Sequence, residues 1–248
     1  MSAVAYGRFM GRFSEPLAPL VADASGVAPG QTVLDVGCGP GALTAVLVER
    51  LGPDHVHAVD TSASFVDAAR ARLPGVDVQV ASAQALPFEA DVFDATLAQL
   101  VVHFMNDPVA GLREMARVTR PGGIVAACVW DQAGGTSPLS PFWETVRSLD
   151  PLEDGEAHLP GARAGHLAQL FEQAGLRPAD DSSLSVQVTF DTFEDWWEPY
   201  TLGVGPAGVY VHQLDDLGRD ALRAACRERL GSGPFDVQAT AWFVRALT

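Results

Sequence analysis

A glycine-rich turn near the start of the chain carries the residues best suited to hold a ligand. Residues 33–41 read Val-Leu-Asp-Val-Gly-Cys-Gly-Pro-Gly, with glycines at Gly37, Gly39 and Gly41. Because glycine has no Cβ, the backbone at these positions can approach a bound molecule closely. Gly37, Gly39 and Ala42 also satisfy the Gly-x-Gly-x-x-Ala spacing of dinucleotide-binding turns. The spacing alone therefore predicts a cofactor-binding turn, and it leaves a nicotinamide cofactor open.

Two acidic residues flank this turn. Asp35 precedes the first glycine by two positions, and Asp60 follows the next apolar run at about the expected distance along the chain. An ionised carboxylate offers two acceptor oxygens to two hydroxyl donors, and such charge-assisted hydrogen bonds are strong. Asp60 is therefore a candidate ligand for a ribose. Asp35 either contacts the ligand or orients the turn by accepting hydrogen bonds from its amides.

Alternating apolar runs and helical patterns predict the elements that position these residues. Each short apolar run is followed by residues with the 3.6-residue period of a helix or by a glycine or proline turn. Such an alternation implies a Rossmann-like, doubly wound α/β fold, in which ligands bind at the carboxyl ends of the strands. The expected strands form a mostly parallel seven-stranded sheet with helices on both faces, and they cover residues 32–36, 55–59, 76–80, 93–98, 124–130, 184–190 and 239–245.

The length of 248 residues allows one substantial domain, or one core that carries a small lid, and does not require two independent domains. We expect a single domain with three parts. Residues 1–30 are expected to form an N-terminal helical cover, and residues 31–130 a cofactor-binding core. Residues 131–248 would add the remaining strands and a helical lid. Within the core, Asp107 and Pro108 are expected to begin a helix, and Arg120-Pro-Gly-Gly123 is expected to form a turn.

As a set, these features resemble motif I and the following segments of the class I S-adenosylmethionine-dependent methyltransferases. Ala81-Ser-Ala-Gln-Ala-Leu-Pro-Phe88 is similar to the family segment that usually reads Gly-Asp-Ala-Glu-x-Leu-Pro-Phe. Leu112-Arg-Glu-Met-Ala-Arg-Val-Thr-Arg-Pro-Gly-Gly123 is similar to the stretch that leads to the fifth strand. The branch with these segments includes quinone C-methyltransferases and many small-molecule enzymes.

The resemblance implies that S-adenosylmethionine is the cofactor. Asp60 would accept hydrogen bonds from both ribose hydroxyls, and Gln99 would contact the methionine part. Tyr6 and Arg12 would close over the methionine carboxylate. The full set of implied cofactor-binding residues is Tyr6, Arg12, Asp35, Gly37, Cys38, Gly39, Gly41, Asp60, Thr61, Ser82, Ala83, Gln84 and Gln99.

One residue departs from the family pattern. Ser82 stands where the family usually has an aspartate that holds the adenine amino group. A hydroxyl also accepts this hydrogen bond, but the loss of the charged acceptor costs about 1 kcal/mol. We therefore expect a modest affinity for the cofactor.

The sequence contains one candidate for a catalytic side chain. His103 follows the fourth strand, where a general base could act on a hydroxyl of the methyl acceptor. The alternative is a histidine that only lines the pocket. A sulfonium is already an activated electrophile, so orientation of donor and acceptor away from water can supply most of the acceleration. We expect no metal, because no carboxylates lie near Gln99 in the sequence.

Two clusters in the C-terminal part have two interpretations each. Trp196, Trp197 and Tyr200 either form a wall over the acceptor or fill the core of the lid. Arginines at positions 219, 223 and 227 recur every four residues, which is typical of a solvated helix face and less often of an anion site.

Composition narrows the function further. The formal net charge is −15 and all sixteen basic residues are arginines, which excludes lysine-dependent phosphate loops and Schiff bases. The negative field disfavours nucleic acid as a partner and favours a neutral or cationic small-molecule methyl acceptor. No apolar stretch is long enough to span a membrane, and the protein is expected to be cytoplasmic. A nicotinamide-dependent oxidoreductase and a non-catalytic cofactor-binding module remain the alternatives.

Overall fold

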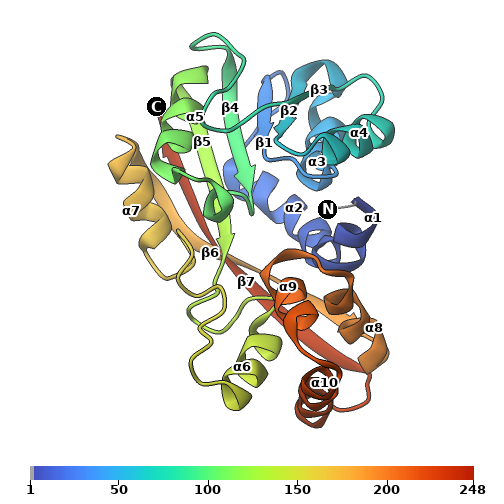
Figure 1. The fold of residues 1–248 in the computed structure, drawn as a ribbon. Helices are drawn as coiled ribbons and strands as arrows, with labels where there is room; N and C mark the ends of the chain where they lie inside the picture. Colours follow the sequence, from blue (N-terminus) through green and yellow to red (C-terminus); the bar gives the residue numbers. More distant parts are fainter. Residues whose placement is uncertain (1–2) are drawn as a thin grey trace.

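The computed structural model describes residues 3–248, which fold around a seven-stranded sheet (Figure 1). The strand order is β3-β2-β1-β4-β5-β7-β6. β1 to β5 run parallel, whereas β7 is antiparallel to both β5 and β6. This confirms the predicted α/β fold with a mostly parallel sheet. The strands are β1 Val33–Val36, β2 Val56–Asp60, β3 Asp77–Val80, β4 Phe93–Gln99, β5 Thr119–Trp130, β6 Arg177–Phe190 and β7 Phe235–Leu247.

Helices connect most of these strands, and the chain begins with helices and ends with β7. Asp107 caps α5 as predicted, because its side chain accepts a hydrogen bond from the Ala110 amide. The α-helices are α1 Ala3–Tyr6, α2 Arg12–Ser25, α3 Ala42–Leu51, α4 Ala63–Arg72, α5 Pro108–Val118, α6 Ser140–Leu149, α7 His166–Gln173, α8 Phe193–Trp197, α9 Gly205–Gln213 and α10 Asp216–Leu230. Shorter helical turns are η1 Gly7–Gly11, η2 Pro53–His55, η3 Val102–Phe104 and η4 Glu198–Leu202.

Hydrophobic cores cover both faces of the sheet. On one face α2 and α3 pack with the sheet, and Leu47 of α3 is fully buried there. On the other face α5 and α7 contribute the buried side chains of Met115 and Phe171. Neighbouring residues of β1 belong to different cores, Val33 to the first and Leu34 to the second, because successive side chains of a strand point to opposite faces. The central strands are therefore buried on both sides.

The centre of the sheet determines where a ligand can bind. β1 lies between β2 and β4, and all three strands run in the same direction. Their carboxyl ends therefore meet at one edge of the sheet. The connections from β1 and β4 leave toward opposite sides at this point, which creates a crevice in doubly wound sheets.

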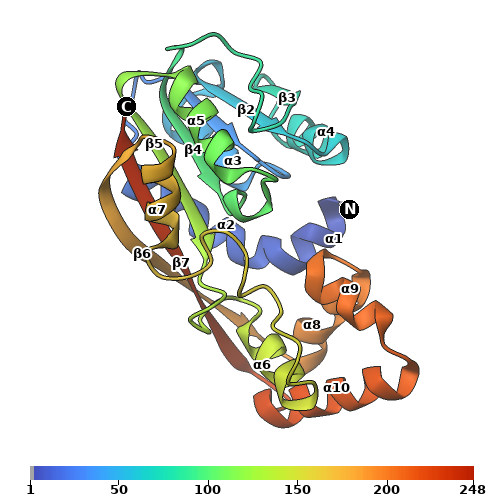
Figure 2. The same cartoon turned by 60° about the vertical axis from the view of Figure 1, so that its left-hand side comes forward.

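A second group of helices lies at the far end of the two longest strands. α6, α8, α9 and α10, which we call the distal helices, gather around the ends of β6 and β7 that lie away from β3 (Figures 1 and 2). α1 and α2 run between these helices and the parallel part of the sheet (Figure 2). None of the helices among residues 3–248 is both long and apolar enough to cross a membrane.

The strands at the C-terminal edge differ in length from the prediction. β6 begins at Arg177 and pairs with β7 along its whole length, although a strand was expected only at residues 184–190. Residues 177–183 contain no apolar run because β6 is an edge strand with mostly exposed or half-exposed side chains. Residues 119–123 belong to β5 in place of the expected turn, and the register between β4 and β5 shifts there.

The tryptophan cluster is part of the core between the distal helices. Trp196, Trp197 and Tyr200 are at most 5% exposed. The ring of Tyr200 stacks on Phe142 of α6, with ring centres 4.5 Å apart. The core interpretation is therefore correct for these three residues.

We expect the buried side chain of Leu47 in α3 to contribute strongly to the free energy of unfolding. Leu47→Ala should lower the free energy of unfolding by about 2–5 kcal/mol, because it leaves a cavity in a fully buried position. Leu217→Ala is the matched control, since Leu217 is 81% exposed, and it should change stability by less than about 0.5 kcal/mol. Equilibrium urea unfolding of both variants measures the difference. Equal losses in the two variants would contradict the packing described here.

Candidate functional site

The turn after β1 has a conformation that only glycine adopts easily. Gly37 has φ of +70°, and the amides of Gly37 and Cys38 both donate to the Val59 carbonyl, at 2.8 and 2.9 Å. A Cβ on Gly37 would lie 2.3 Å from the side chain of Val101. The chain after β1 is therefore held against the end of β2 and against the loop after β4.

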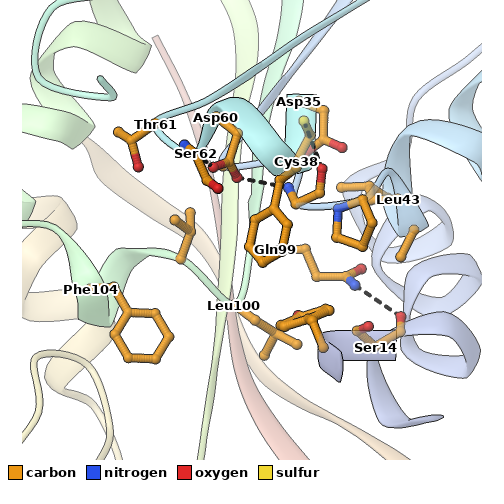
Figure 3. A pocket seen from close by; sticks show the side chains of 17 residues that line it. Ser14, Asp35, Cys38, Leu43, Asp60, Thr61, Ser62, Gln99, Leu100 and Phe104 are labelled. Atoms are coloured by element: carbon orange, nitrogen blue, oxygen red, sulfur yellow. Dashed lines mark hydrogen bonds between the residues drawn. The ribbon is translucent and has the colours of Figure 1, made fainter. Parts of the chain in front are cut away.

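Asp60 ties this turn to the next helix. One of its carboxylate oxygens accepts from the Gly39 amide and the other from the Ser62 amide, both at 2.8 Å. Asp60 closes β2, so its short side chain reaches across to the neighbouring turn (Figure 3). Each carboxylate oxygen has further lone pairs, and the side chain is partly accessible from the adjoining cavity.

A cavity of about 320 Å³ opens at the carboxyl ends of β1, β2 and β4, and we call it the main cavity (Figure 3). This volume is within the range of small-molecule sites. Gly39 borders it with φ of +55° and has no heavy atom within 4 Å of the position where a Cβ would be. The sequence-predicted residues that line the main cavity are Tyr6, Asp35, Gly37, Cys38, Gly39, Asp60, Thr61 and Gln99.

A second hollow of about 350 Å³, the side cavity, adjoins the main cavity. The two share Gly37, Asp60 and Thr61 in their walls. The predicted residues Ser82, Ala83 and Gln84 line the side cavity. Ser82 Oγ accepts a hydrogen bond from the Gln84 amide at 3.2 Å, so part of its acceptor capacity is already used in the turn.

Asp35 is a buried acid in the wall of the main cavity. It is 1% exposed, and its Oδ2 accepts from the Thr44 hydroxyl at 2.6 Å. Its Oδ1 has no hydrogen-bond partner within residues 3–248. Burial raises the pKa of Asp35 to about 7, the Thr44 hydrogen bond opposes this rise, and the nearby Asp60 adds to it. A positively charged ligand at this wall would relieve the cost of ionising the group.

Gln99 provides a second buried acceptor. Its Nε2 donates to the Ser14 carbonyl of α2 at 2.9 Å, which fixes the amide (Figure 3). Its Oε1 is buried and, like Asp35 Oδ1, has no partner in the described chain. Two unpaired acceptor atoms in the walls of one cavity suit a ligand with several N–H donors. The ammonium group of a bound amino acid moiety has these donors, so the residues present fit the cofactor that the resemblance implies.

Two residues of the predicted cofactor set lie outside the main and side cavities. Arg12 lies 4.2 Å from the centre of the Phe190 ring and donates to the Thr189 carbonyl, because its position on α2 directs it toward β6. Gly41 has φ of +89°, and a Cβ there would approach Leu73 to 3.1 Å, so it permits close packing of α3 on α4. In this structure both residues make contacts within the protein, and their contacts with the cofactor stay a prediction.

A third, smaller cavity of about 70 Å³ borders the main cavity, and we call it the small cavity. Tyr6, Leu100 and Phe104 line both. The small cavity extends toward the distal helices, where Val204 and Ala207 belong to its wall. The small cavity therefore lies between the main cavity and the distal helices.

His103 lines the small cavity but is poorly suited to accept a proton. The side chain is buried, with the residue 5% exposed, and burial lowers the pKa of His103 to about 3. The imidazole is therefore neutral at physiological pH and captures a proton weakly. Of the two interpretations of this residue, the structure favours the one in which it lines the pocket.

Several residues of the site were not anticipated from the sequence. Phe104 is 59% exposed and lines all three cavities. Leu100 has φ of +62°, an uncommon conformation for leucine, and turns the chain after β4. Leu100 follows Gln99 directly and Phe104 lies five positions after it, so their place after the fourth strand was a usable signal. Glu156 lies in the small-cavity wall, and it comes from a loop without any motif.

Cysteines and metal-type donor groups do not add to the site. Cys38 is a buried free thiol in the main-cavity wall, and burial raises its pKa, so it remains protonated. Within residues 3–248 no group of three or more His, Cys, Asp or Glu side chains is arranged to hold a metal ion.

The three arginines that recur along α10 form ion pairs at the surface. Arg223 and Arg227 pair with Glu194, and Arg219 pairs with Asp216, which is typical of a solvated helix face.

Comparisons with known proteins agree with this geometry. A family model described as a methyltransferase domain matches residues 34–127. A demethylmenaquinone methyltransferase of Renibacterium salmoninarum is 40% identical over 104 residues, covering 42% of this chain and 43% of the relative. An uncharacterized protein of Mycobacterium tuberculosis is 34% identical over 226 residues, covering 86% of this chain and 77% of the relative.

The structural comparison supports the fold. The crystal structure of the YcgJ protein of Bacillus subtilis superimposes with a TM-score of 0.59 at 16% identity, over 93% of this chain and 97% of that chain. Matches to the first four curated relatives extend over only 33% to 45% of those proteins' own lengths. This chain therefore spans less than half the length of these four relatives.

The buried carboxyl of Asp35 predicts a pH-dependent stability. An acid whose pKa is raised in the folded state destabilises the fold once the pH exceeds its unfolded value, and the penalty grows until about pH 7. In the ligand-free protein, Asp35→Asn should therefore raise the free energy of unfolding by roughly 2–4 kcal/mol at pH 8 and by clearly less at pH 5.

Urea unfolding at the two pH values tests this prediction. Asp54→Asn, at an exposed position before β2, is the control and should have nearly the same small effect at both pH values. A gain from Asp35→Asn that is independent of pH would show that the buried carboxyl is not the source.

Proposed function

Because this chain belongs to the class I S-adenosylmethionine-dependent methyltransferases, we propose that it transfers a methyl group to a small-molecule acceptor bound in the small cavity. The family assignment rules out the nicotinamide alternative. S-adenosylmethionine is the cofactor, and when bound it supplies a methyl group that the sulfonium has already activated.

The main and side cavities together would hold the cofactor. Asp60 has free lone pairs for ribose hydroxyls, and it is held in place by the amides of the turn. Asp35 Oδ1 and Gln99 Oε1 would accept hydrogen bonds from the ammonium group of the methionine part. Ser82, with its neighbours in the side cavity, would contact the adenine.

The observation that carries the proposal for the acceptor is the shared wall between two cavities. Tyr6, Leu100 and Phe104 border both the main cavity and the small cavity, so molecules in the two would be neighbours. The walls of the small cavity are mainly apolar, which excludes water from a bound acceptor.

This arrangement supports catalysis mainly by orientation. Holding two reactants side by side converts a bimolecular step into an effectively unimolecular one. The low pKa of His103 argues against this side chain as a strong general base.

We expect Asp60→Ala to weaken binding of S-adenosylhomocysteine about 10- to 100-fold, because hydrogen bonds to a charged group are lost. Asp67→Ala removes an exposed carboxylate from α4 and should leave the affinity within about twofold. Isothermal titration calorimetry of both variants and the parent protein measures the effect. An unchanged affinity in Asp60→Ala would remove this residue from the site.

Turnover separates an enzyme from a non-catalytic binding module. The protein is incubated with methyl-labelled S-adenosylmethionine and a metabolite extract, and the product S-adenosylhomocysteine and any labelled compound are identified. We expect a labelled small molecule of low molecular mass. Cofactor binding without methyl transfer to any component of the extract would favour the module.

A further inference from the structure

The wall of the small cavity is mainly apolar and aromatic, with the polar side chains of His103 and Gln132 and one carboxylate, that of Glu156. Phe104, Trp130 and Tyr6 contribute aromatic rings, and Leu139 and Val204 contribute aliphatic groups. Glu156 supplies the carboxylate and is only 4% exposed. A buried carboxylate is costly unless a donor or a cation compensates it.

The hydrogen bonding of Glu156 is incomplete. Its Oε2 accepts from the indole Nε1 of Trp143 at 3.0 Å. Its Oε1 has no hydrogen bond within the described part of the chain, and none of the arginines there pairs with Glu156. Burial raises the pKa of Glu156, which the Trp143 hydrogen bond and the nearby His158 partly oppose. The Trp143 indole is therefore the one side-chain donor that hydrogen-bonds to this buried carboxyl group in the described part of the chain.

The loop that carries Glu156 is packed in a defined position. Gly155 has φ of +60°, and a Cβ there would lie 2.6 Å from the ring of Trp143. The loop therefore lies flat against the indole that also donates to Glu156. Trp143 itself is 4% exposed and packs edge-on against Phe142. The carboxylate is held against the cavity by these contacts and is not a mobile surface group.

Three observations favour a positively charged occupant of the small cavity. The carboxylate attracts a cation and repels an anion. The aromatic rings that line the cavity also attract a cation through their π faces. The formal net charge of −15 favours the approach of positively charged molecules. A neutral alcohol could donate to Glu156 but would leave its charge uncompensated.

We propose that the small cavity binds a small organic amine in its ammonium form, with Glu156 as the counter-charge. This inference rests on the proposed function, because it names the chemical class of the methyl acceptor. An ammonium nitrogen has no lone pair, so it would first give a proton to the Glu156 carboxylate; the new N–CH3 bond would then form as the S–CH3 bond of the methyl donor breaks, with S-adenosylhomocysteine as the leaving group. The volume of about 70 Å³ restricts the amine to a small apolar body, since drug-sized ligands occupy pockets of about 300–1,000 Å³. Glu156 thereby determines specificity for the acceptor.

Benzylamine and benzyl alcohol provide a matched pair of probes. They have nearly the same shape, and at pH 7.5 the amine carries a positive charge whereas the alcohol is neutral. Each is titrated into the protein saturated with S-adenosylhomocysteine, and binding is followed by calorimetry. We expect the amine to bind at least tenfold more tightly than the alcohol. Equal affinities, or no binding of either probe, would overturn the proposal.

Two charge-matched variants then test Glu156 itself. Glu156→Gln keeps the shape of the side chain and should reduce the affinity for benzylamine at least tenfold while changing that for benzyl alcohol less than twofold. Asp154→Asn removes one negative charge from the same loop, at an exposed side chain, and should leave both affinities within about twofold. A full preference for the amine in Glu156→Gln would contradict the role of this residue.

Binding of S-adenosylhomocysteine separates a failure of the proposed function from a failure of the assigned acceptor class. The affinity for this ligand should be the same in the parent protein and in Glu156→Gln, which also shows that the variant is folded. If S-adenosylhomocysteine does not bind to the parent protein, the proposed function fails and the inference fails with it. If it binds and the amine is not preferred, only the assignment of the acceptor class is wrong.

Discussion

The turn between β1 and α3 is the constraint on which the rest of the site depends. The Gly37 and Cys38 amides share one carbonyl at the end of β2, and the Gly39 amide donates to Asp60. Val101 fills the space that a side chain on Gly37 would need. The loops after three parallel strands are therefore fixed to one another, and the main cavity is the space that remains between them and the N-terminal helices.

Sequence patterns predicted this central part well, for a physical reason. Parallel strands buried on both faces need continuous apolar runs, and the turn needs glycine, so both leave a local signal. The start of β6 left none, because its exposed side chains place no demand on hydrophobicity. Arg12 was assigned to the cofactor by resemblance, whereas its side chain stacks on Phe190. Glu156 reaches the small cavity from a loop, and only the tertiary packing around Trp143 reveals it.

Some polar side-chain atoms of the site are hydrogen-bonded within the protein, whereas others have no partner there. Asp35 and Gln99 keep buried acceptor atoms without partners, and a fold selected only for stability would pair or replace them. Asp60, in contrast, accepts from two of the protein's own amides and keeps further lone pairs. In the proposed function the unpaired atoms of Asp35 and Gln99 would bind the charged end of the cofactor, and Asp60 lies in the walls of both the main and side cavities.

Leu100 and Phe104 belong to the wall of the main cavity and to that of the small cavity. A molecule in either space therefore changes the freedom of the same two side chains, and Leu100 has little freedom because its backbone is already in the left-handed region. Free energies of binding to one protein are linked reciprocally. Whatever factor the methyl donor contributes to the affinity of the acceptor, the acceptor must return to the donor. The shared wall is thus the contact through which the two binding equilibria would be coupled.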